Sequence, residues 1–424
     1  MQVLLNYGKG KLPVEIDGRR VDAVLRKSRP EVISDPEGAL LSALEHPLAG
    51  GPLKDLCAPG KSACVVVSDI TRPVPNQVLL PGLLEYLESC GVRRKDITIL
   101  IATGMHRPAG DEELLALLGR EVVRDYQVLN HHPESEEMLE HLGFTARGTA
   151  IEINKSYLQA DLKILTGLIE PHFMAGYSGG RKSICPGISG LDSLRYTHGI
   201  ECLSHPLAAN CVREGNPFHQ EALEVAQAAG CDFMVNAVID EGRNLTGLFA
   251  GEMEAAHEAG CDFVDRYFKV GIGGPGEIVL TTNAGYPLDI DFYQTVKGLC
   301  GALPAVKPGG TIIIASRCPE GLGSERFGEL LKELKNAKSR QDFLDAHREK
   351  FVPDQWEVQK LLQVLDKAGF LIFSGGLSKE DAELGQGLKI DSIEQGLKLA
   401  FQRHGSGARV IVIPEGPYVV PEPS

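Results

Sequence analysis

The sequence predicts an α/β fold of two domains, with mostly parallel sheets flanked by helices. Short β-branched, apolar runs alternate along the chain with longer stretches of helical periodicity, which is typical of parallel βαβ units. Glycine (48 residues) and proline (25) are plentiful, while aromatic residues make up only 6%, as expected for many strand–loop–helix junctions. With 424 residues, 43% of them hydrophobic, the chain can form more than one core.

The alternation starts after Gly60. A β-branched run ends at Asp69, a helix follows and is closed by Gly91, and the cycle of strand, loop and helix then repeats. Further strands are predicted before the longest glycine-rich loop, and a helix after it. The predicted strands are 62–69, 96–104, 150–154 and 161–167, and the predicted helices are 76–91, 111–119 and 191–199.

A domain boundary is predicted in the glycine-rich stretch 268–277, which follows a helical stretch ending near Tyr267. We therefore expect an N-terminal α/β domain over 1–270 that binds the cofactor and carries the catalysis. A C-terminal α/β domain over 271–424 would close over it, with the active site in the interdomain cleft. The C-terminal pattern predicts strands at 277–285, 309–316, 370–375 and 408–416, and helices at 292–306 and 327–337.

Charge and cysteine usage exclude several classes of function. The formal net charge is −14 with no basic block, so a nucleic-acid partner is not expected. No apolar run approaches the roughly 20 residues that a membrane span needs, and no signal peptide is evident, so we expect a cytoplasmic protein without a membrane partner. The ten cysteines are scattered without a Cys-x-x-Cys pair, which favours reduced, mostly buried thiols.

Polar side chains follow three predicted strands, where ligands of parallel sheets bind. Asp69 and Arg72 come after the first strand, and Arg72 can bind a carboxylate with two parallel hydrogen bonds. His106 follows the second strand and His172 the fourth. Two imidazoles on neighbouring loops suit a racemase, which needs a base on each side of its substrate. The same pair could equally bind zinc.

The segment Ser178-Gly-Gly-Arg-Lys-Ser183 is a candidate anion-binding loop. Backbone N–H groups at Ser178, Gly179 and Gly180 can approach a phosphate, and Lys182 adds positive charge beside another cation. Neither a Walker A sequence nor a Gly-x-Gly-x-x-Gly motif after the first strand is present, so an ordinary nucleotide site is poorly supported. Lys182 is also a candidate for covalent attachment, because a desolvated lysine beside a cation is a better nucleophile.

Two further groups are candidates. His198 ends the predicted helix 191–199 and could ligate nickel or zinc. Tyr293, Gln294 and Lys297 open the predicted helix 292–306, and the last two share one face of it, from which they could reach a carboxylate or ketone oxygen. A solvated helix face is the alternative interpretation.

Taken together, these motifs resemble the nickel-dependent lactate racemase family of 2-hydroxyacid racemases. The motifs DITRP, ATGMHRP, EPHFMAGYSGGRKSICPG, THG and YQTVKG occur in the order that the family shows, across nearly the whole chain. The resemblance implies racemisation of a small 2-hydroxy acid, lactate or a related acid, by reversible hydride transfer. It implies nickel held in a pincer nucleotide cofactor, a pyridinium-3-thioamide-5-thiocarboxylic acid mononucleotide, and proteins that synthesise this cofactor as partners.

The resemblance also assigns roles. Lys182 resembles the lysine tethered to the cofactor, His198 the nickel ligand, and His106 and His172 the paired acid/base histidines. Asp69 resembles a cofactor-side contact, and Arg72, Gln294 and Lys297, with Tyr293 beside them, resemble the residues that hold the substrate. Two alternatives stay open: a zinc-dependent hydrolase using His106, His172 and His198, or a non-catalytic carrier of the nucleotide cofactor.

Overall fold

The computed structural model describes residues 1–423, which form two compact units. The first, which we call the inserted unit, comprises residues 29–197 and 211–266. The second, the terminal unit, comprises residues 1–28, 198–210 and 267–424, so that both ends of the chain belong to it. Among the residues described, no helix is long and apolar enough to cross a membrane.

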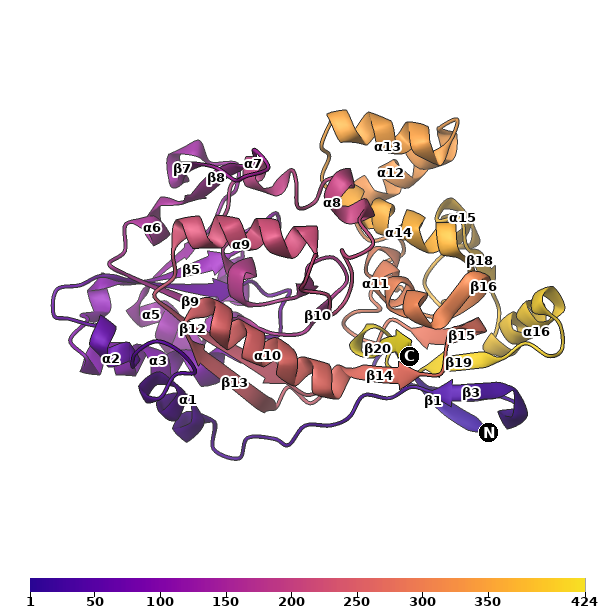
Figure 1. The fold of residues 1–424 in the computed structure, drawn as a ribbon, viewed down its shortest axis with the longest axis horizontal. Coiled ribbons are helices and arrows are strands. Elements are labelled where there is room, and N and C mark those ends of the chain that lie inside the picture. Colours follow the sequence, from indigo (N-terminus) through magenta and orange to yellow (C-terminus); the bar gives the residue numbers. More distant parts are fainter. Residues whose placement is uncertain (424) are drawn as a thin grey trace. The chain divides into compact units, whose positions relative to one another are not determined.

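The inserted unit is built on a six-stranded sheet in the order β13-β12-β9-β4-β5-β6 (Figure 1). Its neighbouring strands run parallel except for β13, which pairs antiparallel with β12. Strands β4, β5 and β9 near the centre are mostly apolar and buried, as expected for parallel strands that are covered on both faces. The strands are β4 (Ala63–Ser68), β5 (Ile97–Ala102), β6 (Gln127–Asn130), β9 (Leu162–Leu168), β12 (Phe233–Ile239) and β13 (Leu245–Gly251).

Helices on one face of this sheet form a single apolar core with it. Val65, Val67, Ile99 and Ile101 of β4 and β5 are fully buried there, each contributing roughly 1.5–3 kcal/mol to folding. The short helical turn η4 (Gly180–Ser183) contacts strands β9 and β4 and also packs against helix α9. The helices of the unit include α1 (Pro36–Glu45), α3 (Asn76–Ser89), α4 (Asp111–Leu118), α5 (Arg120–Asp125), α7 (Leu191–Leu194), α9 (Pro217–Ala229) and α10 (Met253–Phe268).

The terminal unit has a second six-stranded sheet, in the order β18-β17-β16-β15-β19-β3, with every neighbouring pair parallel. Its edge strand β3 comes from the start of the chain and pairs with β19 from near the end. The strands are β3 (Val21–Val24), β15 (Gly276–Thr282), β16 (Val306–Ala315), β17 (Ala368–Phe373), β18 (Leu388–Ile390) and β19 (Val410–Ile413).

Helices pack against the second sheet as well. The hairpin β1–β2 and helix α16 share an apolar core with β15, β16 and β19, while α11 and α14 contact each other as well as β16. Besides the sheet, the terminal unit includes β1 (Gln2–Tyr7), β2 (Gly10–Glu15), α8 (Ile200–Ser204), α11 (Phe292–Ala302), α12 (Glu325–Asn336), α13 (Arg340–Glu349), α14 (Gln355–Lys367), α15 (Lys379–Leu384) and α16 (Ile393–His404).

The predicted fold class is therefore confirmed, and two local expectations need correction. The predicted strand at 150–154 exists as β8 (Ala150–Asn154), but it pairs antiparallel with β7 (Leu139–Phe144) in a hairpin outside the main sheet. The predicted helix 191–199 ends after one turn, at Leu194. His198 accordingly does not end a helix but directly precedes Gly199, the N-cap residue of α8.

Candidate active site

Three adjacent strands of the inserted unit carry the candidate catalytic side chains. Strands β9, β4 and β5 are neighbours, and they end at Leu168, Ser68 and Ala102. Because parallel strands end at the same edge of a sheet, the loops that follow them gather there. Asp69 begins the loop after β4, His106 is the fourth residue after β5, and the loop after β9 leads to His172 in the short strand β10 (Pro171–His172).

The structure joins Asp69 to His106. His106 Nδ1 lies 2.7 Å from Asp69 Oδ2, while Thr71 donates its hydroxyl (2.6 Å) and its backbone N–H (3.2 Å) to Oδ1. Burial raises the pKa of the Asp69 carboxyl, but His106, Thr71 and Arg72 together outweigh burial and hold that pKa below its usual value. The ionised carboxylate only accepts, so His106 Nδ1 carries a proton, and in the neutral ring the lone pair is on Nε2. The His106 side chain is 58% exposed, so this lone pair is accessible.

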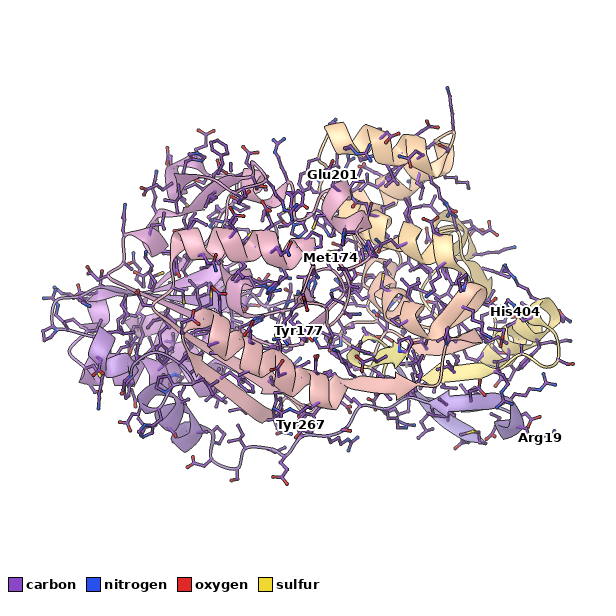
Figure 2. All side chains as sticks on the ribbon, in the orientation of Figure 1. Arg19, Met174, Tyr177, Glu201, Tyr267 and His404 are labelled. Atoms are coloured by element: carbon purple, nitrogen blue, oxygen red, sulfur yellow. The ribbon has the colours of Figure 1, made fainter. Side chains whose placement is uncertain are left out.

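His172 is held in the opposite state. Its Nδ1 accepts the backbone N–H groups of Met174 (3.3 Å) and Ala175 (3.2 Å), so its proton lies on Nε2. Its ring contacts Phe173 and Phe218. Met174 and Tyr177, both labelled in Figure 2, belong to the segment that turns from β10 into β11 (Gly176–Tyr177). One histidine is thus prepared to accept a proton at Nε2, and the other to donate a hydrogen bond there.

Arg72 lies at the same edge. Its Nη1 is 3.6 Å from Glu170 Oε1, and both side chains are partly exposed, at 27% and 19%. Glu170 stands two residues before His172, so this ion pair links the loop after β4 to the loop after β9. A guanidinium in this position can still exchange its partner for a substrate carboxylate.

Polar groups of the glycine-rich segment 178–183 form hydrogen bonds with neighbouring parts of the inserted unit. Gly180 donates its N–H to Asn236 Oδ1 (2.8 Å), and the Ser178 hydroxyl donates to Leu168 O (2.7 Å) while accepting Glu170 N–H (3.0 Å). A Cβ on Gly179 would lie 2.4 Å from Asn236 Oδ1, and both glycines have positive φ, so glycine is required at both positions. These contacts fix the backbone that presents Lys182.

Lys182 is flanked by a buried cation. Arg181 is 1% exposed, and it donates to Ala175 O (2.6 Å) and, from Nη1, faces His257 Nε2 at 3.1 Å. Burial lowers the pKa of Arg181, to about 10. The Lys182 ammonium, by contrast, is only half-buried and lies 5.4 Å from the centre of the Phe218 ring. The cation–π contact with Phe218 holds the Lys182 side chain in place beside the segment 178–181.

In the terminal unit, His198 is 8% exposed and its ring meets the ring of Trp356 edge-on at 5.2 Å. The segment that bears it is held to α14, because Lys360 donates to Ala208 O at 3.0 Å. Within residues 1–423, no group of three or more His, Cys, Asp or Glu side chains is placed to hold a metal ion. His198 is therefore a single-imidazole candidate rather than part of a multidentate protein site.

Helix α11 carries the remaining predicted residues. Asp291 caps it by accepting Gln294 N–H (2.7 Å). Lys297 donates to Gln294 Oε1 at 2.6 Å, which confirms that the two share a face. The Tyr293 hydroxyl accepts from Trp356 Nε1 at 2.9 Å. All three side chains are half-buried.

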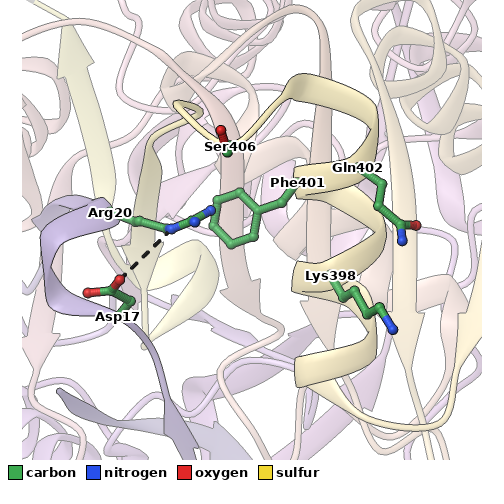
Figure 3. A pocket seen from close by; sticks show the side chains of 6 residues that line it. All are labelled: Asp17, Arg20, Lys398, Phe401, Gln402 and Ser406. Atoms are coloured by element: carbon green, nitrogen blue, oxygen red, sulfur yellow. Dashed lines mark ion pairs between the residues drawn. The ribbon is translucent and has the colours of Figure 1, made fainter.

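A shallow hollow of about 480 Å³ lies elsewhere, between the turn after β2 and helix α16 (Figure 3). Arg20 stacks there on the ring of Phe401 at 4.3 Å and lies 4.0 Å from Asp17. None of the predicted site residues lines this hollow.

Sequence reasoning missed several partners of the predicted residues. Thr71 and Glu170 belong to the motifs DITRP and EPHF. Thr71 lies between Asp69 and Arg72 in sequence, and this proximity could have suggested that it orients one of them. Trp356 and Glu357 gave no such signal, because they are far from any motif and are brought to α11 only by the packing of α14.

Comparisons with known proteins cover nearly the whole chain. Residues 7–210 match the family model of the lactate racemase N-terminal domain, and residues 273–420 match that of the lactate racemase C-terminal domain. The lactate racemase of Thermoanaerobacterium thermosaccharolyticum is 36% identical over 417 residues, which is 98% of this chain and 97% of the relative. The lactate racemase of Lactiplantibacillus plantarum is 35% identical over 382 residues, 88% of each chain.

Solved structures agree. The lactate racemase apoprotein from Thermoanaerobacterium thermosaccharolyticum superposes with a TM-score of 0.92 at 35% identity, over 100% of both chains. A protein from Thermotoga maritima has a TM-score of 0.69 at 17% identity, covering 94% of this chain and 100% of that one, and shows the likeness of fold alone.

Proposed function

Because the chain belongs to the lactate racemase family and is therefore an isomerase, we propose that it interconverts the enantiomers of a small 2-hydroxy acid. We take lactate or a close analogue as the substrate, since both curated relatives are lactate racemases. The alternatives of a zinc hydrolase and of a non-catalytic carrier lose their support, because the family is one of racemases. The reaction is assigned to the cytoplasm.

The observation that carries this proposal is that Nδ1 has opposite partners in the two histidines, a carboxylate for His106 and two backbone N–H groups for His172. His106, oriented by Asp69 at 2.7 Å, has an accessible Nε2 lone pair that can take the hydroxyl proton of a substrate. His172, with Nδ1 occupied by two backbone N–H groups, presents an Nε2–H that can hydrogen-bond to the same oxygen. For the opposite enantiomer His172 becomes the base, which requires its proton to move to Nδ1 at the expense of those two bonds.

The proposed substrate contacts have simple roles. Arg72 binds the carboxylate by parallel hydrogen bonds after exchanging its partner Glu170. Lys297, held by Gln294, supplies a second positive charge, and Tyr293 borders the same helix face. These cations also stabilise negative charge that develops on the C2 oxygen while its proton is held by a histidine.

We further propose a nickel pincer nucleotide as cofactor. When bound, this group would supply the acceptor and donor of the C2 hydride. The donor set fits it: His198 offers one borderline imidazole ligand, as expected for a metal that arrives with three ligands of its own. Lys182 offers an amine for covalent attachment, Asp69 a cofactor-side contact, and Ser178, Gly179 and Gly180 the rigid segment that positions Lys182. Loading such a group requires cofactor-synthesis proteins as partners.

Attachment through Lys182 can be tested by intact mass spectrometry of protein made together with the cofactor-synthesis proteins. The parent is expected to carry a mass adduct that Lys182→Ala lacks, because alanine has no amine. Lys155→Ala, on another lysine of the inserted unit, serves as the control and should keep the adduct. An unchanged adduct on Lys182→Ala places the attachment elsewhere.

The reaction itself is tested with a single enantiomer of lactate that carries deuterium at C2. Hydride transfer returns the same nucleus to C2, so the racemised product is expected to keep its deuterium in ordinary water. Loss of deuterium during racemisation would show that C2–H leaves as a proton, and would overturn the hydride mechanism alone. If no acid of a panel of 2-hydroxy acids is racemised by the loaded protein, the proposed function is wrong.

A further inference from the structure

The turn that follows His172 is held from behind by a fully buried asparagine, Asn216, which is the N-cap residue of α9. Its Oδ1 accepts the backbone N–H groups of Phe218 (2.9 Å) and His219 (3.2 Å). Its Nδ2 donates to two backbone carbonyls at 3.0 Å, one of which is Met174 O. Because the oxygen caps the helix and the nitrogen faces only acceptors, the hydrogen bonds define one orientation of the amide.

The carbonyl of Met174 belongs to the same peptide group as the N–H of Ala175. That N–H donates to His172 Nδ1 at 3.2 Å. The side-chain amide of Asn216, this peptide group and the imidazole therefore form one continuous chain of hydrogen bonds within the inserted unit. A peptide whose carbonyl accepts a hydrogen bond is a better donor at its N–H, because both bonds polarise the same group. Asn216 thus strengthens a bond that occupies Nδ1 of His172.

The rest of the turn is constrained as well. The buried guanidinium of Arg181 donates to the next carbonyl, Ala175 O, at 2.6 Å. Burial lowers the pKa of Arg181 to about 10, so the guanidinium remains charged at neutral pH. One residue further on, Gly176 O accepts the N–H of Cys211 at 3.0 Å. With successive carbonyls held in this way, the turn has little freedom to rotate its N–H groups away from His172.

The chain of hydrogen bonds bears on the acid–base role of His172. Donors directed at Nδ1 favour the neutral ring that carries its proton on Nε2. In the proposed reaction, this form of the ring donates to the C2 oxygen of one enantiomer. With the other enantiomer the ring must accept a proton at Nε2, which requires the form protonated on Nδ1. The chain disfavours that second form and makes the two half-reactions unequal.

We propose that Asn216 is a positioning residue for His172: through the peptide between residues 174 and 175 it sets the balance between the two neutral forms of the ring. It thereby sets the relative rates at which the two enantiomers are oxidised. This inference rests on the proposed function, which assigns acid–base work on a 2-hydroxy acid to His172. Asn216 is fully buried behind the turn and does not touch the substrate.

The first test measures the two forms of the ring in the full chain without cofactor, labelled with ¹⁵N in its histidines. Asn216→Ser keeps an oxygen that can cap α9 but removes the amide donors. At a pH at which the ring is neutral, the ¹⁵N shifts of Nδ1 and Nε2 give the populations, and His172→Gln identifies the signals. We expect the population ratio of the Nδ1–H to the Nε2–H form to rise about fivefold, as the loss of one hydrogen bond implies.

The second test measures single turnovers of the loaded enzyme with each enantiomer of lactate. His172→Ala identifies the enantiomer that needs His172 as its base, because this variant should fail to oxidise it. In Asn216→Ser, the oxidation rate of that enantiomer relative to the other should rise about fivefold, following the change in populations. A packing defect alone would lower both rates together and leave their ratio unchanged.

Asn154 provides a matched control in the same unit. It is also fully buried and caps a helix by accepting Ser156 N–H at 2.9 Å, and its Nδ2 lies 3.1 Å from His131 Nδ1. Asn154→Ser should therefore lower thermal stability as Asn216→Ser does, but change neither the His172 signals nor the ratio of the two rates. Asn216→Thr, which also caps but fills more of the space, replaces Asn216→Ser if the serine variant does not fold.

The outcomes are distinct. If either the His172 populations or the ratio of the two rates keeps its parent value in the Asn216 variant, the inference is wrong while the proposed function stands. If Asn154→Ser changes the ratio as much as Asn216→Ser, the effect does not come from the chain of hydrogen bonds and the inference is also wrong. If the loaded parent oxidises neither enantiomer of any 2-hydroxy acid, the proposed function itself fails, and the ¹⁵N populations still decide whether Asn216 acts on His172.

Discussion

The two units of this protein share an architecture but differ in where they place polar residues. In the inserted unit the loops after β4, β5 and β9 carry exposed or half-buried groups such as His106 and Arg72. In the terminal unit the corresponding strand ends are closed by their own side chains: Ser316 bonds Thr295 at 2.6 Å, and Ser374 bonds Arg317 O at 3.0 Å. The candidate residues of that unit lie instead on the packed helix α11 and, for His198, just before α8. Two six-stranded α/β sheets therefore carry their candidate residues at the sheet edge in one unit and beside the sheet in the other.

The histidines of the inserted unit show a second contrast. His106 has one ring nitrogen on a carboxylate and the other accessible, whereas His131 is fully buried, with Nε2 on Ser189 O (3.0 Å) and Nδ1 on Asn154 Nδ2 (3.1 Å). Burial lowers the pKa of His131 to about 4, so it stays neutral in the physiological range. Burial likewise lowers the pKa of His257. Satisfied, buried imidazoles are structural, whereas the exposed imidazole of His106 at a strand end suits acid–base work.

The largest effect is expected from the two strand-end histidines. His106→Ala and His172→Ala should each lower turnover on the order of 10²-fold or more, the usual scale for general acid–base catalysis. In a single turnover, each variant should form 2-keto acid from one enantiomer only, and from opposite ones. Rapid quench followed by keto-acid assay measures this. Equal oxidation of both enantiomers by both variants would contradict the opposed assignment.

The terminal unit should contribute the metal ligand. His198→Ala is expected to lower nickel retention about tenfold, because the proposed role of this imidazole is to complete the coordination of the metal. The organic part, which we propose is attached at Lys182, should remain. Metal analysis and intact mass of the same samples separate the two quantities. His404→Ala, at the end of α16, is the control and should keep its nickel. Equal nickel in His198→Ala and the parent would remove His198 from the ligand set.

A smaller effect is expected for stability. The pKa of Asp69 is below its usual value in the folded protein, so its contribution to stability is fully present above the unfolded-state pKa, near 3.9, and is lost as the pH falls through the folded pKa. At neutral pH, Asp69→Asn should lower the free energy of unfolding by about 1–3 kcal/mol. Denaturant titrations at several pH values should show this gap closing below about pH 4. A gap that does not change with pH would mean that the ionised carboxylate is not its source.

The smallest effect should come from a strand end of the terminal unit. Ser374→Ala removes a hydroxyl that donates to Arg317 O and accepts Leu377 N–H at 3.1 Å. We expect a loss of about 1 kcal/mol in the free energy of unfolding and a turnover within twofold of the parent. A tenfold loss of turnover would show that this edge belongs to the site after all, and the contrast between the two units would disappear.

The regular part of the fold was predictable because local sequence determines it. Continuous apolar runs rich in β-branched residues predict buried parallel strands, and such runs form β4, β5, β9, β15, β16 and β19. The hairpin β1–β2 and the edge strand β3 escaped prediction, because their stability depends on partners remote in sequence, such as Val410–Ile413 for β3. The helix predicted to end near His198 failed for a related reason: its residues bond to distant segments, as Ser193 does to Glu152 N–H at 2.9 Å.

The candidate site was predictable in its residue types and not in its pairings. Asp69 and His106 were singled out from neighbouring strand ends, but 37 positions of separation gave no indication that they bond to each other. The glycine-rich segment 178–183 was expected to offer its backbone N–H groups to a phosphate, but the N–H of Gly180 donates a hydrogen bond to Asn236 Oδ1 instead. Trp356 could not be predicted at all, since only the packing of α14 on α11 brings its indole N–H to the Tyr293 hydroxyl.

The arrangement of the chain has a consequence for its synthesis. All residues of the inserted unit have been translated by Arg266, whereas β3 cannot pair until β19 emerges, about 390 residues after β3 itself. At ribosomal rates of roughly 5–20 residues per second, the N-terminal strand waits on the order of 20–80 seconds for its partner. The inserted unit can therefore be complete, and Lys182 presented, while the terminal unit that bears Lys297 is still on the ribosome. Nascent chains arrested shortly after Arg266 would consequently be the earliest species able to meet a cofactor-loading partner.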